Sequence, residues 1–407
     1  MVTPLGNSAP TTWQGAIEGR SGITRLTRFD PSDLPESVCI AGELKGFSAD
    51  SVMDRKEARR VDLFIQYALA AADEALRCAG LGGLGQLPDP DETGIVVGSG
   101  IGGIGTILET AALVAERGTS RVSPFFIPSV ITNLAAGHLA MRTGARGPNY
   151  ATVSACATSN HAIGDAYHII RRGDARMMIA GAAEAAITLL SFAGYNAARA
   201  LATEYDRVEE ASRPFDSRRS GFVHAEGAGI LILESLESAR ARGAEVLAEV
   251  GGIGMSSDAH HITAPPDDGS GAALAITRAM KSAGVAPEEV GYINAHGTST
   301  PVGDVAETRA IRAAFGAHAD HLVVSSTKSM LGHALGATAA IEAGLTIFAL
   351  REGLMPPTIN LTHPDSECDL DYAPHTARRG EIQVALSNSF GFGGANTSLL
   401  LRRWNEG

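Results

Sequence analysis

The segment TVSACATSNHAIGDA, residues 152–166, decides how the rest of this sequence is interpreted. An apolar run leads into Cys156, and a small-residue pattern typical of a helix follows it. A thiol at a helix N-terminus feels the positive end of the helix dipole, which favours the thiolate. The small neighbours Ala155, Ala157 and Ser159 leave room for an acyl group to approach the sulfur. A lone cysteine is more often a buried structural residue, so Cys156 becomes a candidate nucleophile only through its partners downstream.

A second segment, SSTKSMLGHALGATAAIEAGL (325–345), shares a faint similarity with SACATSNHAIGDAYHIIRRGD (154–174), since each opens a helix after a strand-like run. This weak evidence for duplication predicts two similar halves that face each other. Strand-like and helix-like runs alternate, which predicts an α/β protein with largely parallel, covered sheets. The expected strands are 94–98, 177–183, 229–234, 291–297, 322–328 and 384–390, and the expected helices are 56–80, 161–172, 271–284, 303–315 and 336–352.

Two histidines occupy positions where an open α/β sheet places its ligands. His296 lies in NAHGTSTPVGD after a strand-like run, and His333 lies in KSMLGHALGATAA at the start of a Gly- and Ala-rich helix. Each alone is more often a hydrogen-bonded core histidine. Together with Cys156 they form a set at the carboxyl ends of expected strands, which predicts a shared site. The other histidines, including His260 and His261, lack this setting and are interpreted as surface or core residues.

Two glycine-rich loops follow strand-like runs. GSGIGG (98–103) matches the GxGxxG pattern, but no acidic residue ends a second strand about 20 positions later, as a dinucleotide site requires. The preferred interpretation is a tight turn that lets backbone approach another segment. GFGGAN (391–396) is predicted to be a flexible hairpin whose peptide N–H groups could form an oxyanion hole.

Composition excludes several classes of protein. The 407 residues carry a net charge of −12, which argues against sequence-independent nucleic-acid binding. The longest apolar stretch, about 177–194, is interrupted by Glu184 and hydroxyl residues, so no membrane span and a soluble protein are expected. No signal peptide is recognised at the start. The cysteines show neither CxxC pairs nor zinc-ligand spacing, which predicts no metal and a reducing cytoplasm; they are Cys39, Cys78, Cys156 and Cys368.

Four motifs together carry a family resemblance; they are GPNYATVSACATSNHAIGDA, YINAHGTSTPVGD, SSTKSMLGHALGATAAIEA and NSFGFGGANTSLL. They resemble the β-ketoacyl-acyl carrier protein synthases of the thiolase superfamily, above all the type II elongating condensing enzyme. The resemblance covers about residues 2–402. It implies a five-layered α/β/α/β/α fold of two duplicated halves, here 1–240 and 241–407, working as a homodimer.

The resemblance also implies roles for individual residues. Cys156 matches the acyl-accepting nucleophile, and His296 and His333 match the pair that assists decarboxylation of malonyl-acyl carrier protein. Lys328 matches the lysine beside them, and Glu342 matches an acid that contacts this lysine or a bound monovalent cation. The other matches are Phe392 with a gating residue of the oxyanion hole, Thr298 and Thr300 with hydroxyls that contact the phosphopantetheine arm, and Ile101 with the acyl tunnel.

The implied reaction is a decarboxylative Claisen condensation that elongates an acyl chain by two carbons. Its substrates are acyl and malonyl thioesters of acyl carrier protein, and it uses no redox or metal cofactor. Acyl carrier proteins are acidic, so a chain at −12 needs a local basic patch to bind one. We predict that patch at Lys56, Arg59, Arg60 and Arg199; a solvated helix face is the alternative interpretation.

Some features depart from the family pattern, and other functions stay open. The family usually has a strand before the TPLG segment, and this sequence begins inside that segment, so either its start is assigned late or the sheet lacks a strand. His224 replaces a more common aliphatic residue, for reasons that the sequence does not explain. The alternatives are a ketosynthase of a dissociated polyketide pathway and a catalytically silent carrier-protein-binding subunit. A thiolase is disfavoured because Cys368 lies outside a glycine-rich C-terminal motif.

Overall fold

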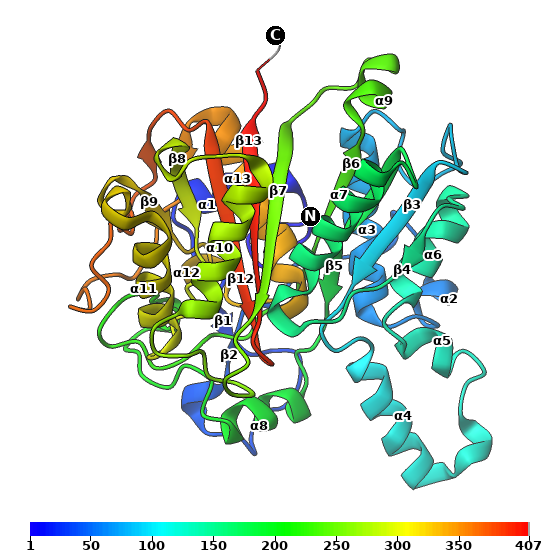
Figure 1. Cartoon of the computed structure of the whole chain (residues 1–407). Coiled ribbons are helices and arrows are strands. Elements are labelled where there is room, and N and C mark those ends of the chain that lie inside the picture. The colour runs from blue at the N-terminus through cyan, green and yellow to red at the C-terminus, as the bar shows by residue number, and fades with distance from the viewer. Residues whose placement is uncertain (406–407) are drawn as a thin grey trace.

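The computed structural model describes residues 1–405, which form two large β-sheets with helices between and outside them (Figure 1). The first sheet has the order β4-β3-β5-β6, and the second has the order β7-β13-β12-β8-β9. The strands of the first are β3 (Thr93–Gly98), β4 (Asn149–Tyr150), β5 (Met177–Glu184) and β6 (Gly227–Glu234). Those of the second are β7 (Ala248–Ser257), β8 (Val290–Asn294), β9 (Val323–Ser325), β12 (Val384–Gly391) and β13 (Ala395–Arg403).

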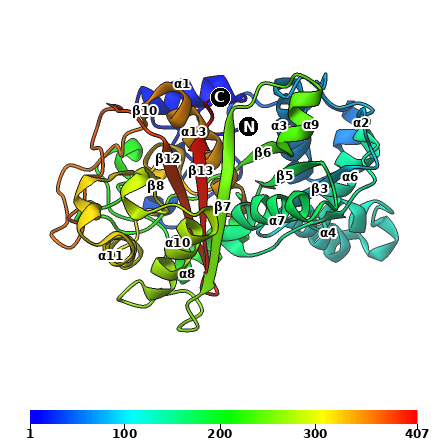
Figure 2. The ribbon, with the colours of Figure 1, turned by 45° about the horizontal axis from the view of Figure 1, so that its top comes forward.

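The helices divide into a central layer and two outer layers. The helices are α1 (Ala9–Ile17), α2 (Arg55–Ala58), α3 (Leu63–Cys78), α4 (Ile104–Arg117), α5 (Phe126–Val130), α6 (Leu134–Thr143), α7 (Thr158–Arg172), α8 (Leu189–Ala197), α9 (Leu236–Ala241), α10 (Ser270–Ala283), α11 (Gly303–Phe315), α12 (Lys328–Leu331) and α13 (Thr338–Glu352). α7 and α13 lie between the sheets, α3 and α6 cover the first sheet, and α10 covers the second with α11 beside it (Figure 2). The predicted five-layered fold is therefore confirmed.

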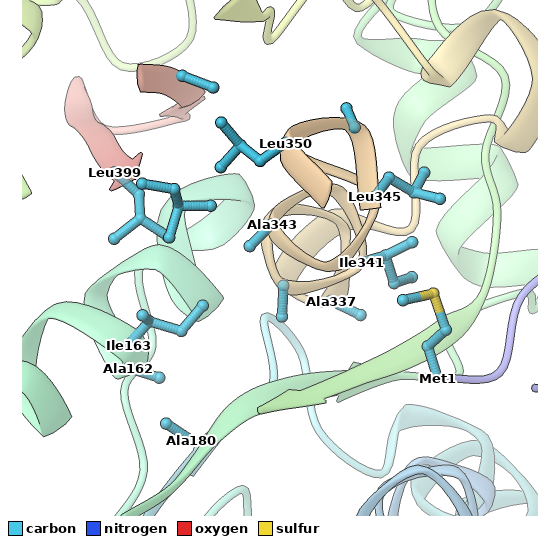
Figure 3. Packing of buried hydrophobic residues seen from close by; sticks show 14 of the residues in the cluster. Met1, Ala162, Ile163, Ala180, Ala337, Ile341, Ala343, Leu345, Leu350 and Leu399 are labelled. Atoms are coloured by element: carbon cyan, nitrogen blue, oxygen red, sulfur yellow. The ribbon is translucent and has the colours of Figure 1, made fainter. Parts of the chain in front are cut away.

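The central layer is held by small and aliphatic side chains. Ala162 and Ile163 of α7 and Ile341 of α13 belong to one buried cluster with Ala180 of the first sheet and Leu399 of the second (Figure 3). Alanines let the helices approach both sheets closely, and burying each aliphatic side chain contributes about 1.5–3 kcal/mol. This packing fixes the N-termini of α7 and α13, where the candidate site lies.

The prediction of largely parallel sheets is only partly right. β3 pairs in parallel with β4 and β5, and β8 with β9 and β12. The β5–β6, β12–β13 and β7–β13 pairs are antiparallel. For β12 and β13 the reason is the short Gly-rich connection, which permits a hairpin but not a crossover. The hairpin predicted at 391–396 is thus confirmed.

Several element boundaries also differ from expectation. The single helix expected over 56–80 is broken into α2 and α3, because the side chain of Asp62 caps α3 by accepting from the Phe64 N–H. The strand expected over 322–328 ends at Ser325. β7 was not predicted, because its glycines do not form a strand-like pattern. The close packing of α10 requires glycine there, since a Cβ on Gly254 would lie 1.9 Å from the carbonyl oxygen of Ala275.

Short elements complete the described chain. They are β1 (Thr24–Arg25), β2 (Ile40–Ala41), β10 (Leu354–Met355), β11 (Arg378–Arg379) and the 3₁₀ turns η1 (Glu36–Val38), η2 (Thr119–Arg121), η3 (Ala155–Ala157), η4 (Val208–Glu210), η5 (Pro287–Glu289), η6 (Gly316–His321) and η7 (Leu335–Ala337). Val2 forms a single bridge with Ala228 of β6. Among residues 1–405, every helix is too short or too polar to cross a membrane. The division at residue 240 stays a prediction.

Candidate active site

Cys156 lies in a sharp turn between β4 and α7. Ala155 has φ +49°, a left-handed conformation that turns the chain into η3 just before the helix. The Thr158 hydroxyl donates to the Ala155 carbonyl (2.7 Å) and accepts from the Ser154 N–H (2.9 Å), which braces the turn. The Ser389 hydroxyl donates to the Cys156 carbonyl at 2.8 Å. The turn presents the sulfur, whose residue is only 8% exposed, at the wall of a cavity.

Both candidate histidines converge on this sulfur. His333 Nε2 lies 2.9 Å from Sγ of Cys156, and its Nδ1 lies 3.1 Å from Oγ1 of Thr338. The His296 ring centroid lies 5.5 Å from that of His333, edge to face. One ligating atom from each of Cys156, His296 and His333 lies within 4.8 Å of the other two. The structure therefore brings together the three residues that the motifs singled out.

The backbone holds each imidazole in place. The N–H groups of His296 and Gly297 donate to the Glu307 carboxylate at 2.9 and 2.7 Å, which fixes the turn after β8. The N–H of His333 donates to the Val223 carbonyl at 2.7 Å, and its carbonyl accepts from the Ala225 N–H. Sequence reasoning missed Glu307, although an acid in the helix after the His-Gly turn is a usable signal.

Lys328 and Glu342 form a buried ion pair beside the histidines. Nζ of Lys328 donates to both carboxylate oxygens of Glu342, at 2.8 and 2.7 Å, and the Thr327 hydroxyl adds a third hydrogen bond. The contact of Glu342 with the lysine agrees with what the resemblance implied. The pair places a cationic Nζ close enough to lower the pKa of both imidazoles.

The surroundings of Cys156 contradict the expectation that its sulfur is a thiolate. Burial raises the pKa of the Cys156 thiol to about 12, although the Lys328 charge and the N–H groups of Phe392 and Cys156 lower it. Desolvation therefore outweighs the helix terminus, and the resting sulfur is a thiol. Burial and the Lys328 charge hold the pKa of His296 and His333 well below the usual range. A neutral thiol thus faces two neutral imidazoles.

The cavity around the sulfur has a volume of about 460 Å³ and reaches the surface. Thr298 and Thr300 line it, with their hydroxyl oxygens 3.1 Å apart, and Ile101 lies along its wall. Phe392, 42% exposed, stands in the hairpin between β12 and β13, and its N–H points at the sulfur. Gly393 donates to the Ile262 carbonyl at 2.7 Å, which ties the hairpin to a neighbouring loop.

Glu184, which the sequence analysis did not single out as a site residue, organises the wall of this cavity. Its buried carboxylate accepts from the Ser99 hydroxyl and from the N–H groups of Gly100, Ile101 and Gly336 at 2.7–3.1 Å. A Cβ on Gly100 would lie 2.7 Å from this carboxylate. The GSGIGG loop is therefore a tight turn that permits close backbone approach. An acid ending the buried strand MMIAGAAE was the available signal.

His224, unexplained by the sequence, supports the same wall from behind. Its Nε2 lies 3.0 Å from the Ala186 carbonyl, and its ring is packed by Phe192, Tyr195 and Phe222, with centroids 5.5–6.4 Å away. Burial lowers its pKa, so the ring is neutral. Because Tyr195 and Phe222 line the cavity, His224 holds two aromatic side chains of its wall in place.

The four predicted docking residues do not share one hollow. Lys56, Arg59 and Arg60 are exposed in and after α2, and Arg60 stacks on the Phe125 ring at 4.5 Å. Arg59 and Arg60 line a second hollow, whereas Arg199 lines the mouth of the cavity that contains Cys156. The basic residues therefore lie at two places on the surface.

Comparison with curated proteins covers the whole chain. The family model "Beta-ketoacyl synthase, N-terminal domain" matches residues 1–239, and "Beta-ketoacyl synthase, C-terminal domain" matches residues 247–362. A Synechocystis protein named "3-oxoacyl-[acyl-carrier-protein] synthase 2" is 51% identical over 99% of this chain and 96% of the relative. The protein of that name from Staphylococcus aureus strain N315 is 49% identical, with the same coverage.

Solved structures agree in fold. A β-ketoacyl synthase from Burkholderia phymatum superposes with a TM-score of 0.90 at 35% identity, covering 99% of this chain and 97% of the other. The ketosynthase complex AntDE:AntF, described as a type II PKS acyl-carrier protein with its ketosynthase, gives 0.89 at 32% identity with the same coverage. The chain belongs to the beta-ketoacyl synthase family and has its thiolase-like fold.

Proposed function

We propose that this protein is a 3-oxoacyl-acyl carrier protein synthase, which condenses malonyl-acyl carrier protein with an acyl group held on Cys156 and elongates fatty acids by two carbons. The observation that carries the proposal is the convergence of Cys156, His296 and His333 within 4.8 Å in one cavity. The curated relatives at 49–51% identity favour fatty acid over polyketide synthesis.

The first half-reaction loads the acyl group. Because the resting sulfur is a thiol, its proton passes to Nε2 of His333, 2.9 Å away, as Sγ attacks the thioester carbonyl. The oxyanion accepts from the N–H groups of Cys156 and Phe392, each worth roughly 10²–10³-fold in rate. The proton returns to the leaving thiolate of the phosphopantetheine arm, whose amides meet the hydroxyls of Thr298 and Thr300.

The second half-reaction forms the new carbon–carbon bond. The malonyl thioester loses CO₂, and the electron pair of the broken bond moves onto its thioester oxygen. His296 and His333 each donate an N–H to this enolate oxygen without adding a competing charge. The enolate carbon then attacks the acyl-Cys156 carbonyl, and the cysteine sulfur leaves as a thiolate that takes up a proton from solvent. Lys328 acts through its charge, which helps to keep both imidazoles neutral.

No redox or metal cofactor is part of this proposal, but we include a structural monovalent cation near Glu342 in it. Asn294 Oδ1, Ser387 Oγ and Asn160 Oδ1 are buried without a hydrogen-bond partner in residues 1–405. Asn294 Nδ2 donates to the Glu342 carbonyl, and Asn160 Nδ2 donates to the Ser387 carbonyl. Asn294 of β8 pairs with Ser387 of β12, so the three residues are neighbours. An oxygen-only donor set suits a hard cation. Its part would be to fix this backbone.

The carrier protein is proposed to dock on the basic residues. Arg199 lines the Cys156 cavity, and Arg59 and Arg60 line the second hollow. The proposal is that one acidic partner contacts both places. Reversing Arg59 and Arg60 to Glu should raise KM for carrier-bound substrates and leave kcat little changed. An unchanged KM would refute the patch and leave the solvated-face interpretation.

We also propose that the protein forms a homodimer and that it works in the cytoplasm. Within residues 1–405, β4 is an edge strand of the first sheet whose outer side is unpaired. Tyr150 in β4 and Val153 just after it are 38% and 59% exposed. An open edge with exposed apolar side chains favours pairing with another chain. Ile127, 58% exposed, lies on α5, which packs on α6, the helix that contacts β4. Ile127→Asp should therefore shift sedimentation towards the monomer. All four cysteines are free thiols, which suits a reducing compartment.

The test is to incubate the protein with malonyl-acyl carrier protein and acyl-carrier proteins from C4 to C16. Mass spectrometry should detect acylated Cys156 and products longer by two carbons. Replacing His296 and His333 together should abolish CO₂ release. Unimpaired CO₂ release would refute the histidine roles, and a protein that never acylates Cys156 would be the silent carrier-binding subunit.

A further inference from the structure

The two half-reactions place opposite demands on one atom, Nε2 of His333. During acyl transfer Nε2 must offer a lone pair to the thiol proton of Cys156, 2.9 Å away. During decarboxylation the same nitrogen must carry a hydrogen that it donates to the enolate oxygen. A neutral imidazole has one N–H, so the ring must be the Nδ1–H tautomer in the first step and the Nε2–H tautomer in the second.

The partner of Nδ1 decides whether both tautomers are accessible. A carbonyl oxygen there would fix the Nδ1–H form, and a backbone N–H would fix the other. Nδ1 instead meets Oγ1 of Thr338 at 3.1 Å, and a hydroxyl both donates and accepts. Within residues 1–405, Oγ1 of Thr338 has no other hydrogen-bond partner, so it is free to turn. The main chain of His333 is held between Val223 and Ala225, so the ring can change tautomer without moving.

We propose that Thr338 is a positioning residue that supports both tautomers of His333, its hydroxyl accepting from Nδ1–H in acyl transfer and donating to Nδ1 in decarboxylation. The inference rests on the proposed function. Between the two steps the ring loses the Nδ1 proton and gains one on Nε2 by exchange with solvent, so it carries one proton in both forms and gains no net proton. The Thr338 hydroxyl rotates as this exchange occurs.

Two variants separate this role from simple packing. Thr338→Val keeps the shape and removes both hydrogen-bonding capacities, and Thr338→Ser restores them. Acyl transfer to Cys156 is followed by mass spectrometry, and CO₂ release from malonyl-acyl carrier protein is followed separately. Val should slow each half-reaction by about tenfold, the equivalent of one lost hydrogen bond, and Ser should bring each rate back to within about threefold of the wild type. Slowing of only one half-reaction, or failure of Ser to restore both, would overturn the proposal.

A spectroscopic comparison tests the same idea without turnover. The ¹⁵N shifts of His333 should report Nδ1–H in the free protein. After Cys156 is alkylated with iodoacetamide, the thiol proton is gone and the adduct offers a carbonyl, so the ring should change to Nε2–H. The same tautomer in both states would refute the role of Thr338. A wild-type protein that condenses nothing would instead refute the proposed function, and the shifts would still decide on Thr338.

Discussion

The turns that precede α7 and α13 are two versions of one structure. Ala155 and Leu335 both adopt left-handed backbone, with φ +49° and +45°, and each opens a three-residue 3₁₀ turn. A 15-residue helix follows each turn and begins with a threonine, Thr158 or Thr338. The similarity noticed between the two sequence segments is therefore matched in the backbone.

What differs is the residue at the tip of each turn. The first turn presents the Cys156 side chain to the cavity, whereas the second has Gly336, whose N–H donates to Glu184. A Cβ on Gly336 would lie 2.6 Å from the backbone nitrogen of Gly100, so no side chain fits there. The Thr158 hydroxyl makes both of its hydrogen bonds within its own turn, whereas the Thr338 hydroxyl contacts Nδ1 of His333. The repeated turn thus presents a thiol to the cavity in one half and a backbone donor to Glu184 in the other.

The largest effect is expected from removing the side chain that distinguishes the first turn. Cys156→Ala should abolish condensation, because no acyl-enzyme can form. CO₂ release from malonyl-acyl carrier protein should persist, since both imidazoles remain. Loss of both activities in a folded variant would contradict this division of labour between thiol and imidazoles.

Glu184→Gln tests the support supplied by the second turn. Burial raises the pKa of Glu184 to about 7 from an ordinary value of 4.5. The folded protein therefore binds this proton more tightly than the unfolded chain does. The resulting stabilisation of the folded state is complete below pH 4.5 and is lost as the pH rises to 7. Between these values the wild type should lose on the order of 3 kcal/mol of unfolding free energy relative to the variant. Parallel pH profiles in urea denaturation would contradict the assignment.

A smaller effect, on the free energy of unfolding, should distinguish Thr158 from Thr338. Thr158→Val leaves the Ser154 N–H and the Ala155 carbonyl without their partner and should cost about 2 kcal/mol in unfolding free energy. Thr338→Val should cost under about 1 kcal/mol, because it breaks one side-chain contact. Urea denaturation measures both. Equal losses would show that the two turns are braced in the same way.

Much of this arrangement could be predicted from the sequence, and the failures have physical causes. Periodicity and the motifs located the central helices and the three residues that meet in the cavity, Cys156, His296 and His333. β7 was missed because its glycines, selected by contact with α10, carry no strand pattern. The expectation that Cys156 is a thiolate was wrong, because the cost of desolvating a charged sulfur depends on its burial in three dimensions. Glu184 accepts from the N–H of Gly100, which is far away in the chain, and Thr338 contacts the ring of His333. Sequence spacing alone indicates neither contact.

The central claim is that a neutral thiol gives its proton to His333. The direct measurement is the rate of acyl transfer from acyl-carrier protein to Cys156 in His333→Asn at neutral pH, with His296→Asn as the matched control. His333→Asn should lose roughly 10²-fold or more, the contribution of a general base. A rate equal to that of the wild type would show that the sulfur is already ionised and needs no base.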